Sequence, residues 1–448
     1  MRNETWHGER RRRRLVLVPC PYQGHITPML QLGTILYSRG FSITISHAIF
    51  NSPVPKTHPH FRFVPIPDGL SESDISSGDI THILSTINEN CKLSFLHLME
   101  SQEDEIVCII FDEHMYFAEA VATKLKLPTI ILRTTSSATF LARFALLGLK
   151  AEGYIPCQDS ISNDMVPKLH PLRFKDLPLP KSPDFKRAAQ LVLDSYTIRN
   201  SSAVIWNTMD CLEQTCLMQI QQECPVPIFP VGPIHKIAQP TSSSLLKEDS
   251  SCIAWLDKQS RNSVVYVSLG SIASLGEKEI AEMAWGLANS EQLFLWVVRS
   301  DSIPGSNWTE ILPKGFKDGL GEKGCIVKWA PQKEVLAHEA VGGFLSHCGW
   351  NSTLESISQG VPLICKPCFG DQRVNARYVC HEWKVGVELE KIERGEVERA
   401  VRKVIVDDEG KEMRERARDL KEKVEVSTRK GGSSYNYLNE VVDLIMSF

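Results

Sequence analysis

The stretch "VGGFLSHCGWNSTLESISQGVPLI" runs from Val341 to Ile364. It begins with an apolar run typical of a buried strand, passes through a polar turn into a short helix, and ends in a second apolar run. Strand, helix and strand in this order predict two parallel strands joined by a helix. The turn begins at His347 and holds more polar residue types than a simple packing turn needs. It is therefore a candidate for a binding site.

Both halves of the chain repeat this alternation of strand and helix. In the first half, short apolar segments rich in β-branched residues alternate with helix-like segments from residue 15 to residue 208. The alternation resumes at residue 263 and continues to residue 367. Apolar strands separated by helices predict parallel sheets that carry helices on both faces. We therefore predict an α/β protein with two doubly wound, Rossmann-like domains that face a cleft.

A change of composition marks the expected boundary between the two domains. Residues 233–250 are rich in Pro, Ser and Lys, as is typical of a linker. We expect an N-terminal domain over residues 1–232 and a C-terminal domain over residues 251–432. The last helix, at about 433–448, is expected to pack back on the N-terminal domain.

The overall composition argues against several classes of protein. The 448 residues are 42% hydrophobic and 23% charged, with a net charge of -4, which is ordinary for a globular protein. The basic run Arg10–Arg14 could bind nucleic acid, but no second basic cluster supports it, and a solvated flank is the simpler interpretation. No run approaches the ~18 apolar residues of a membrane-spanning helix. We expect no nucleic-acid partner, no membrane span and, by default, a monomer.

The cysteines suggest a reducing compartment. They number thirteen, an odd count, and are scattered along the chain. The apolar run after the N-terminal arginines stops at Pro19, which is too short for a secretory signal. We therefore expect reduced thiols and a cytoplasmic location. Cys365 and Cys368, followed by Cys380 and His381, could suggest zinc, but the second pair is adjacent, whereas zinc knuckles use spaced pairs.

The polar turn after 341–346 has the chemistry of a phosphate site. Ligands of doubly wound sheets bind outside the carboxyl ends of the strands. Asn351 and Ser352 open a helix there, and a helix start offers unpaired N–H donors and a partial positive charge to phosphate. His347 can donate to an oxyanion. A structural alternative remains for Ser352 and Glu355, whose spacing also fits a capping box.

Three other predicted strand ends carry complementary groups. Small residues ending one strand could contact phosphate, a tryptophan followed by free backbone groups could stack on a base and read its edge, and a carboxylate beside an amide could bind vicinal sugar hydroxyls. In chain order these candidates are Ser271, then Trp329 with Ala330 and Gln332, then Asp371 with Gln372.

A second constellation belongs to the first half of the chain. His25 follows the first predicted strand and Asp112 ends a later one, so both lie at the same edge of the expected sheet. A histidine can take a proton from a hydroxyl near neutral pH, and an aspartate can fix its tautomer. The alternatives are a helix-start histidine, an aspartate that caps the next helix, and His114 as a rival base. Thr134, Ser136 and Ser137 follow another strand and are candidates to line a pocket.

Residues 329–372 carry a resemblance to a known family. This segment of 44 residues, "WAPQKEVLAHEAVGGFLSHCGWNSTLESISQGVPLICKPCFGDQ", resembles the signature box of plant family 1 UDP-glycosyltransferases, the plant secondary product glycosyltransferases. The likeness includes "GHITPMLQLG" near the start and extends over most of the chain. The N-terminal half and the closing "KGGSSYNYL" are similar to the group with steviol, cytokinin and small-acid glucosyltransferases. The family has the GT-B architecture, with an acceptor-binding N-terminal domain and a UDP-sugar-binding C-terminal domain.

The resemblance implies a role for each candidate. His25 would be the catalytic base, assisted by Asp112, and Gln372 is the family's usual residue for glucose. In the donor site, Trp329 and the backbone of Ala330 and Gln332 would bind the uracil, and Glu355 would bind the ribose. The residues that would bind the diphosphate are Ser271, His347, Asn351 and Ser352. The residues that would bind the sugar are Trp350, Asp371 and Gln372.

The implied reaction is an inverting transfer of glucose. UDP-glucose would be the co-substrate, and the acceptor would be a hydroxyl, or a carboxyl, of a small lipophilic molecule such as a terpenoid or phenolic. The chain has no Asp-x-Asp motif, so we expect neither a metal nor another cofactor. Alternatives are another UDP-sugar and a catalytically silent UDP-sugar binder. A dinucleotide-dependent oxidoreductase would need a G-x-G-x-x-G turn, which the strand ends lack.

Overall fold

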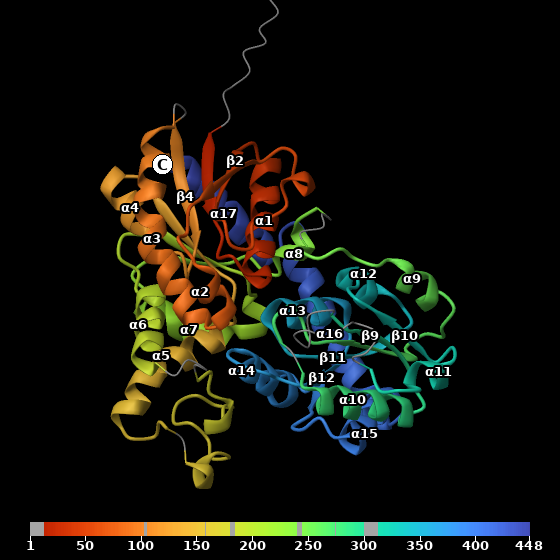
Figure 1. Ribbon diagram of the computed structural model, residues 1–448. Helices are drawn as coiled ribbons and strands as arrows, with labels where there is room; N and C mark the ends of the chain where they lie inside the picture. The colour runs from red at the N-terminus through yellow and green to blue at the C-terminus, as the bar shows by residue number, and fades with distance from the viewer. Residues whose placement is uncertain are drawn as a thin grey trace, which may run out of the picture.

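The structure is a computed structural model in which two lobes lie side by side (Figure 1). Each lobe is a parallel sheet flanked by helices, which follows from strands that are apolar along their whole length. The second lobe is drawn in green to blue, and the C-terminal helix returns to the first. The structure describes residues 13–102, 105–156, 158–179, 184–239, 244–273, 275–299 and 312–448, without the side chains of 317 and 318.

The first sheet has seven strands in the order β3-β2-β1-β4-β5-β6-β7, all parallel to their neighbours. Every residue of β4 is buried because helices cover both faces of the sheet. The strands are β1 (Arg14–Val18), β2 (Ser42–Ala48), β3 (Arg62–Ile66), β4 (Ile106–Asp112), β5 (Thr129–Arg133), β6 (Ala203–Trp206) and β7 (Ile228–Pro230).

Two apolar clusters hold helices against the opposite faces of this sheet. Helices α3 and α4 contribute to one cluster, and α1 and α17 to the other. The helices of this half are α1 (Gln23–Ser38), α2 (Glu72–Ser77), α3 (Ile80–Glu100), α4 (Phe117–Leu125), α5 (Ser137–Ala151), α6 (Phe185–Tyr196), α7 (Asp210–Glu223) and α8 (Ile234–Ile237), with short 3-10 turns at Pro55–Thr57, Asp159–Ile161 and Phe174–Asp176.

The second sheet has six strands in the order β10-β9-β8-β11-β12-β13. All its pairings are parallel, so the carboxyl ends of the strands share one edge. The strands are β8 (Val264–Ser268), β9 (Leu293–Val297), β10 (Gly324–Val327), β11 (Val341–Ser346), β12 (Leu363–Cys365) and β13 (Gly386–Glu388). The helices are α9 (Ser251–Leu256), α10 (Glu277–Asn289), α11 (Phe316–Leu320), α12 (Gln332–Ala337), α13 (Trp350–Gln359), α14 (Gln372–Arg377), a π-helical turn at Tyr378–Glu382, α15 (Arg394–Ile405), α16 (Asp408–Thr428) and α17 (Ser433–Ser447).

The connection between the sheets differs from a plain linker. Its start forms α8, and Ile234 of that helix is fully buried in the core of the first lobe. At the other end of the chain, α17 packs on the first lobe through Leu438, Val441 and Ile445. We propose that the two domains divide within 233–250, as the sequence suggests, after α8; residues 240–243 of that stretch lie outside the described residues.

Within the part of the chain that the structure describes, no helix is both long enough and apolar enough to cross a membrane.

Candidate active site

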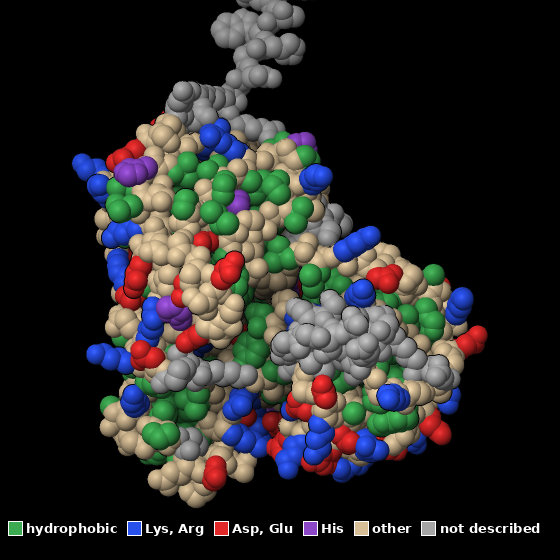
Figure 2. All heavy atoms as spheres, viewed as in Figure 1, with side chains coloured by type: hydrophobic (Ala, Val, Ile, Leu, Met, Phe, Trp, Pro, Cys, Tyr) green, Lys and Arg blue, Asp and Glu red, His purple; other side chains and the backbone are tan. Residues whose placement is uncertain are grey.

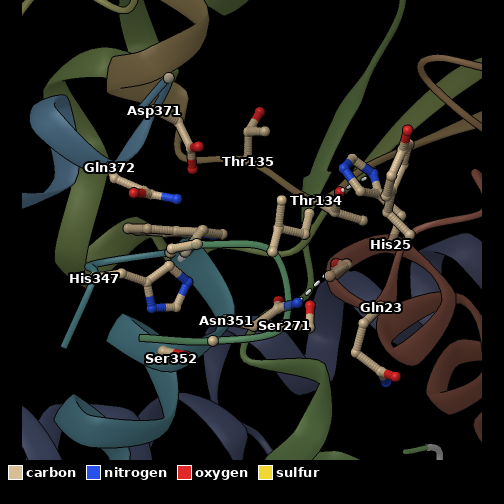
Figure 3. A pocket seen from close by; sticks show the side chains of 18 of the residues that line it. Gln23, His25, Thr134, Thr135, Ser271, His347, Asn351, Ser352, Asp371 and Gln372 are labelled. Atoms are coloured by element: carbon tan, nitrogen blue, oxygen red, sulfur yellow. Dashed lines mark hydrogen bonds between the residues drawn. The ribbon is translucent and has the colours of Figure 1, made fainter. Parts of the chain in front are cut away.

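A cavity of about 1240 Å³ lies where the carboxyl ends of the two sheets face each other. Its lining comes from the turns that follow β1 and β5 in the first lobe and β8, β11 and β12 in the second. Figure 2 shows the hollow between the lobes, and Figure 3 shows His25 at one side of the cavity with His347 and Gln372 at the other. The volume exceeds that of a typical single-ligand pocket, so two substrates can fit together.

His25 and Asp112 meet because of strand register. Val18 of β1 pairs with Phe111 of β4, so the last residue of β4 lies beside the turn that leads into α1. His25 Nδ1 and Asp112 Oδ2 are 2.8 Å apart, and the Thr134 hydroxyl lies 2.8 Å from the same nitrogen. A carboxylate at Nδ1 holds the proton there, which leaves Nε2 with the free lone pair. His25 is thus oriented as a general base.

The charges around His25 favour its imidazolium. Burial opposes protonation, but Asp112, followed by Glu113 and Asp371, raises the pKa of His25 above its ordinary value. The carboxyl group of Asp112 is fully buried, which opposes ionisation, yet His25 lowers its pKa below the usual range. Asp112 does not cap α4, whose N-cap is Tyr116. The pair can accept a proton and stabilise the resulting cation.

His114 is poorly suited to the same task. Its ring centroid is 5.4 Å from that of His25, but its Nδ1 lies 3.0 Å from the Ser195 hydroxyl. Burial lowers the pKa of His114 to about 3, against the effect of Asp112. A base with so low a pKa gains little by taking a proton from a hydroxyl.

The His347 ring lies between two glycines. Ser346 of β11 pairs with Ser268 of β8, so the turns that follow these strands meet. A Cβ atom at Gly270 would lie 2.6 Å from the His347 ring, and one at Gly349 would lie 2.5 Å from it. Burial lowers the pKa of His347 to about 4, so the ring is neutral at pH 7, and its Nδ1 is buried without a hydrogen-bond partner. The neutral ring can donate one hydrogen bond to a ligand oxyanion.

We expect Gly270→Ala to weaken UDP binding by about tenfold or more, because the new methyl group must displace the His347 ring. The φ of Gly270, +74°, adds backbone strain. Gly40→Ala is the control: its φ is +97°, but nothing lies within 4 Å of the added atom. Calorimetric titration with UDP measures the difference, and equal affinities in the two variants would contradict the role of His347.

The side chain of Gln332 organises the start of α13. Its Nε2 donates to Glu355 Oε2 at 2.7 Å and to Ser352 Oγ at 3.0 Å, and the Tyr266 hydroxyl donates to its Oε1 at 3.3 Å. The capping-box alternative is not formed, because α13 begins at Trp350 without a side-chain cap. Burial raises the pKa of Glu355 above its usual range. Its carboxyl group, which lines the cavity, can accept from a ligand hydroxyl.

Trp350 and Asn351 join the second lobe to the first. The Trp350 indole is buried, and its Nε1 donates to the carbonyl of Asn207 at 2.8 Å. Asn351 Nδ2 donates to the carbonyl of Gly24 at 2.7 Å, and its Oδ1 accepts from Asn207 Nδ2 at 3.3 Å. The large indole in a tight turn thus has its partner across the cleft. Asn207 directly follows β6, so the strand-end rule that found the other candidates also points to it.

The remaining donor-side candidates also line the cavity. Trp329 Nε1 donates to the Ser244 hydroxyl at 2.9 Å, which leaves the faces of its ring available for stacking. Ala330 follows it in the same turn. The carbonyl of Ser271 accepts from Arg299, which fixes the turn after β8.

Gln372 is oriented by the turn that precedes it. Its Oε1 accepts from the backbone N–H of Cys368 at 2.8 Å and of Phe369 at 3.1 Å. The Nε2 donors are thus the part of the amide that can serve a ligand. Asp371 accepts from Asn375 Nδ2 at 3.1 Å, and burial raises its pKa. Both residues line the cavity.

We expect Gln372→Glu to lower the affinity for UDP-glucose by about tenfold while leaving the affinity for UDP unchanged. The substitution keeps the oxygen that holds the turn and removes the two donors that can reach sugar hydroxyls. Titration of the variant with each ligand at pH 8 measures the change. An equal loss for both ligands would show that Gln372 acts on the turn and not on the sugar.

Two of the three acceptor-side candidates lie elsewhere. Thr134 lines the cavity, together with Thr135, which sequence reasoning missed. The Ser136 hydroxyl instead caps α5 and donates to Asn375 of the other lobe at 2.8 Å, and Ser137 is fully buried with its N–H donating to Glu213. The sequence pattern correctly marks the strand end but not which residues turn inward.

Among the residues that the structure describes, only one group of side chains is close enough together to coordinate a metal ion. Cys20, His25 and Asp112 offer ligand atoms that all lie within 4.8 Å of one another. The Cys20 thiol is fully buried, and burial with the charge of Asp112 raises its pKa, so it is protonated at neutral pH. A protonated thiol is not a metal ligand. The arrangement of His25 and Asp112 therefore suits proton transfer better than the binding of a cation.

Comparison with known proteins identifies the family. A family model described as "UDP-glucoronosyl and UDP-glucosyl transferase" matches residues 74–420. The chain belongs to the UDP-glycosyltransferase family. UDP-glycosyltransferase 76E1 of Solanum lycopersicum is 48% identical over 97% of this chain and 93% of its own length. Flavonol 3-O-glucosyltransferase UGT76E12 of Arabidopsis thaliana is 48% identical, with 97% of each chain covered.

Solved structures confirm the architecture. The UDP-glycosyltransferase resembles Medicago truncatula UGT71G1 complexed with UDP-glucose, with a TM-score of 0.82, 25% identity and coverage of 97% of this chain and 98% of that one. The predicted α/β, GT-B fold and the resemblance to plant family 1 UDP-glycosyltransferases are confirmed. The narrower likeness to the steviol and cytokinin group stays a prediction.

Proposed function

We propose that this UDP-glycosyltransferase transfers glucose from UDP-glucose to a hydroxyl, or a carboxyl, of a small lipophilic acceptor, with inversion at the anomeric carbon. The observation that carries the proposal is the cavity itself. It brings the His25–Asp112 pair of one lobe and the donor candidates of the other to one space.

The chemistry is a single displacement. His25 Nε2 takes the proton of the acceptor hydroxyl while the oxygen attacks the anomeric carbon from the face opposite UDP. Asp112 holds the ring and stabilises the imidazolium through its 2.8 Å contact at Nδ1. The α-linked donor then gives a β-glucoside without a covalent enzyme intermediate.

Neutral hydrogen-bond donors and the N-terminus of a helix stabilise the leaving diphosphate. His347 offers one N–H, and the first turn of α13 offers backbone donors and a partial positive charge. Asn351 contacts Gly24 across the cleft, so donor binding and lobe closure are coupled at this residue. We propose that these groups neutralise UDP without a metal.

The lining of the acceptor side suits an apolar molecule. Leucines of four segments, among them Leu84, Leu146 and Leu179, line the cavity with Val192 and Phe185. Burial of an apolar acceptor on these side chains contributes roughly 25 cal/mol per Å² of apolar surface. We propose a terpenoid or phenolic acceptor, a monomeric enzyme and a cytoplasmic location.

An assay of UDP release tests the proposal. Purified protein is incubated in EDTA with UDP-glucose and a panel of terpenoid and phenolic alcohols, and released UDP is measured with and without acceptor. Acceptor-dependent release is the expected result. Tight UDP-glucose binding without release for any acceptor would instead support a silent binder, and faster release with another UDP-sugar would reassign the donor.

A further inference from the structure

Arg143 introduces a cation into the apolar side of the cavity. It lies on α5, one turn before Leu146 and Leu147, and all three residues line the cavity. Its Nη1 donates to the Tyr196 hydroxyl at 3.1 Å. Among the residues that the structure describes, no carboxylate lies within ion-pair distance of Arg143. A guanidinium has five N–H donors, so most of its hydrogen-bonding capacity is available to a ligand.

A neighbouring arginine shows the contrasting arrangement. Arg133 is also buried, but its Nη1 lies 3.1 Å from Glu113 Oε2, and its guanidinium packs over the rings of Phe140 and Tyr196 at 4.3 and 5.0 Å. That pair satisfies its charge inside the core. Arg143 is half-buried at the cavity wall and has no such partner, which is the arrangement of a group that binds an anion from outside.

Hydrogen bonds to two neighbouring residues of α6 place Arg143 near the catalytic pair. Arg143 donates to Tyr196, and the preceding Ser195 lies 3.0 Å from Nδ1 of His114, whose ring is 5.4 Å from that of His25. An acceptor anion held by Arg143 therefore lies in the same part of the cavity as the base. Leu146 and Leu147, one turn along α5, also line the cavity, and apolar side chains strengthen an ion pair by excluding water.

We propose that Arg143 binds a carboxylate of the acceptor while a hydroxyl of the same molecule faces His25, so that the preferred acceptors are hydroxy acids. This inference rests on the proposed function and narrows its acceptor class. The hydroxyl loses its proton to His25, its oxygen forms the bond to the anomeric carbon, and the bond to UDP breaks as UDP leaves with the electron pair. The carboxylate is unchanged.

The geometry favours the hydroxyl over the carboxylate as the attacking group. A carboxylate has no proton for His25 to take at neutral pH, and its pairing with a guanidinium reduces its nucleophilicity. A glucoside formed at the hydroxyl of the acid is thus the expected product, and a glucose ester formed at its carboxylate is the contrary one. Mild alkali separates them, since it cleaves the ester alone.

Matched acceptor pairs test the proposal. The 2-, 3- and 4-hydroxybenzoates differ from their methyl esters in the charge that Arg143 would bind and in a single methyl group. We expect at least one acid to exceed its ester in kcat/KM by about tenfold or more, and Arg143→Gln to lower that acid-to-ester ratio about tenfold or more. Arg143→Lys should restore part of it. Lys186→Gln, which removes an exposed charge from α6, is the control and should leave the ratio unchanged.

The outcomes separate this inference from the proposed function. UDP binding and thermal stability of Arg143→Gln are measured first, so that misfolding is recognised. Turnover of esters and acids at similar rates, or an equal loss of both in Arg143→Gln, overturns the role of Arg143 and leaves glucosyl transfer standing. Release of UDP with neither acids, esters nor the neutral alcohols of the panel above overturns both. An alkali-labile product overturns the assignment of the hydroxyl.

Discussion

His25→Ala is expected to lower kcat for glucosyl transfer by about 10²- to 10⁴-fold while leaving UDP affinity within about twofold. His25 lies on the acceptor side of the cavity and is held through Nδ1 by Asp112 and Thr134, so only its other nitrogen can take the acceptor proton. The residues proposed to bind the donor belong to the second lobe, and the substitution leaves them unchanged. Steady-state kinetics and calorimetric titration with UDP measure the two quantities.

His114→Ala is the matched control for this prediction. His114 lines the same cavity beside His25, but its Nδ1 is engaged by Ser195 and its pKa is lowered to about 3. We expect its removal to lower kcat far less than the removal of His25. A nearly inactive His114→Ala beside an active His25→Ala would transfer the role of base to His114.

Asp112→Asn is expected to lower kcat by about 10²-fold or more and to change the pH profile. In the wild type, the charge of Asp112 offsets burial and raises the pKa of His25. The base is active when neutral, so the rate rises with pH through that pKa. Loss of the carboxylate lowers the pKa of His25, and the acid limb of the variant should therefore move to lower pH. Measurement of kcat from pH 5 to pH 9 tests both effects.

A second His–Asp contact provides the control for this substitution. Asp74 Oδ1 lies 2.6 Å from His82 Nε2, and neither residue lines the cavity. Asp74→Asn makes the same chemical change and should leave both kcat and the acid limb unchanged. An acid limb of Asp112→Asn that stayed in place would show that His25 is not the group whose ionisation limits the rate.

The strand-end rule explains how much of the site is readable from the sequence. Parallel strands place their carboxyl ends at one edge, so polar residues after each apolar run had to gather there. His25 and Asp112 meet in this way although 87 positions separate them. His347 and Ser271 do so in the second lobe. Sequence periodicity therefore predicts which turns form the site.

Side-chain direction and contacts between the lobes are not readable in this way. Ser136 and Ser137 follow a strand like Thr134, yet the start of α5 turns them into the protein. The partner of the Trp350 indole is the backbone carbonyl of Asn207 in the other lobe; the strand-end rule marks Asn207 but does not say which group of the other lobe it contacts. The sequence does not specify the contact of the Gln332 side chain with Glu355 either, because that contact depends on how α12 and α13 pack.

The start of the predicted linker shows a similar limit. Composition alone places 233–250 in solvent, because Pro, Ser and Lys dominate it. Ile234 nevertheless completes the core beneath α1, so the four residues of α8 belong structurally to the first lobe. The burial of this one isoleucine makes the start of 233–250 part of the first lobe and not a solvent-exposed linker. Its burial depends on a surface that only the folded lobe provides.

The anomeric configuration of the product tests the central claim most directly. Product is made from UDP-glucose and an accepted alcohol in EDTA, and its configuration is read from the proton NMR spectrum. Direct attack by an oxygen that His25 deprotonates, from the face opposite UDP, predicts the β-glucoside alone. An α-glucoside would contradict the single displacement and with it the role assigned to the His25–Asp112 pair.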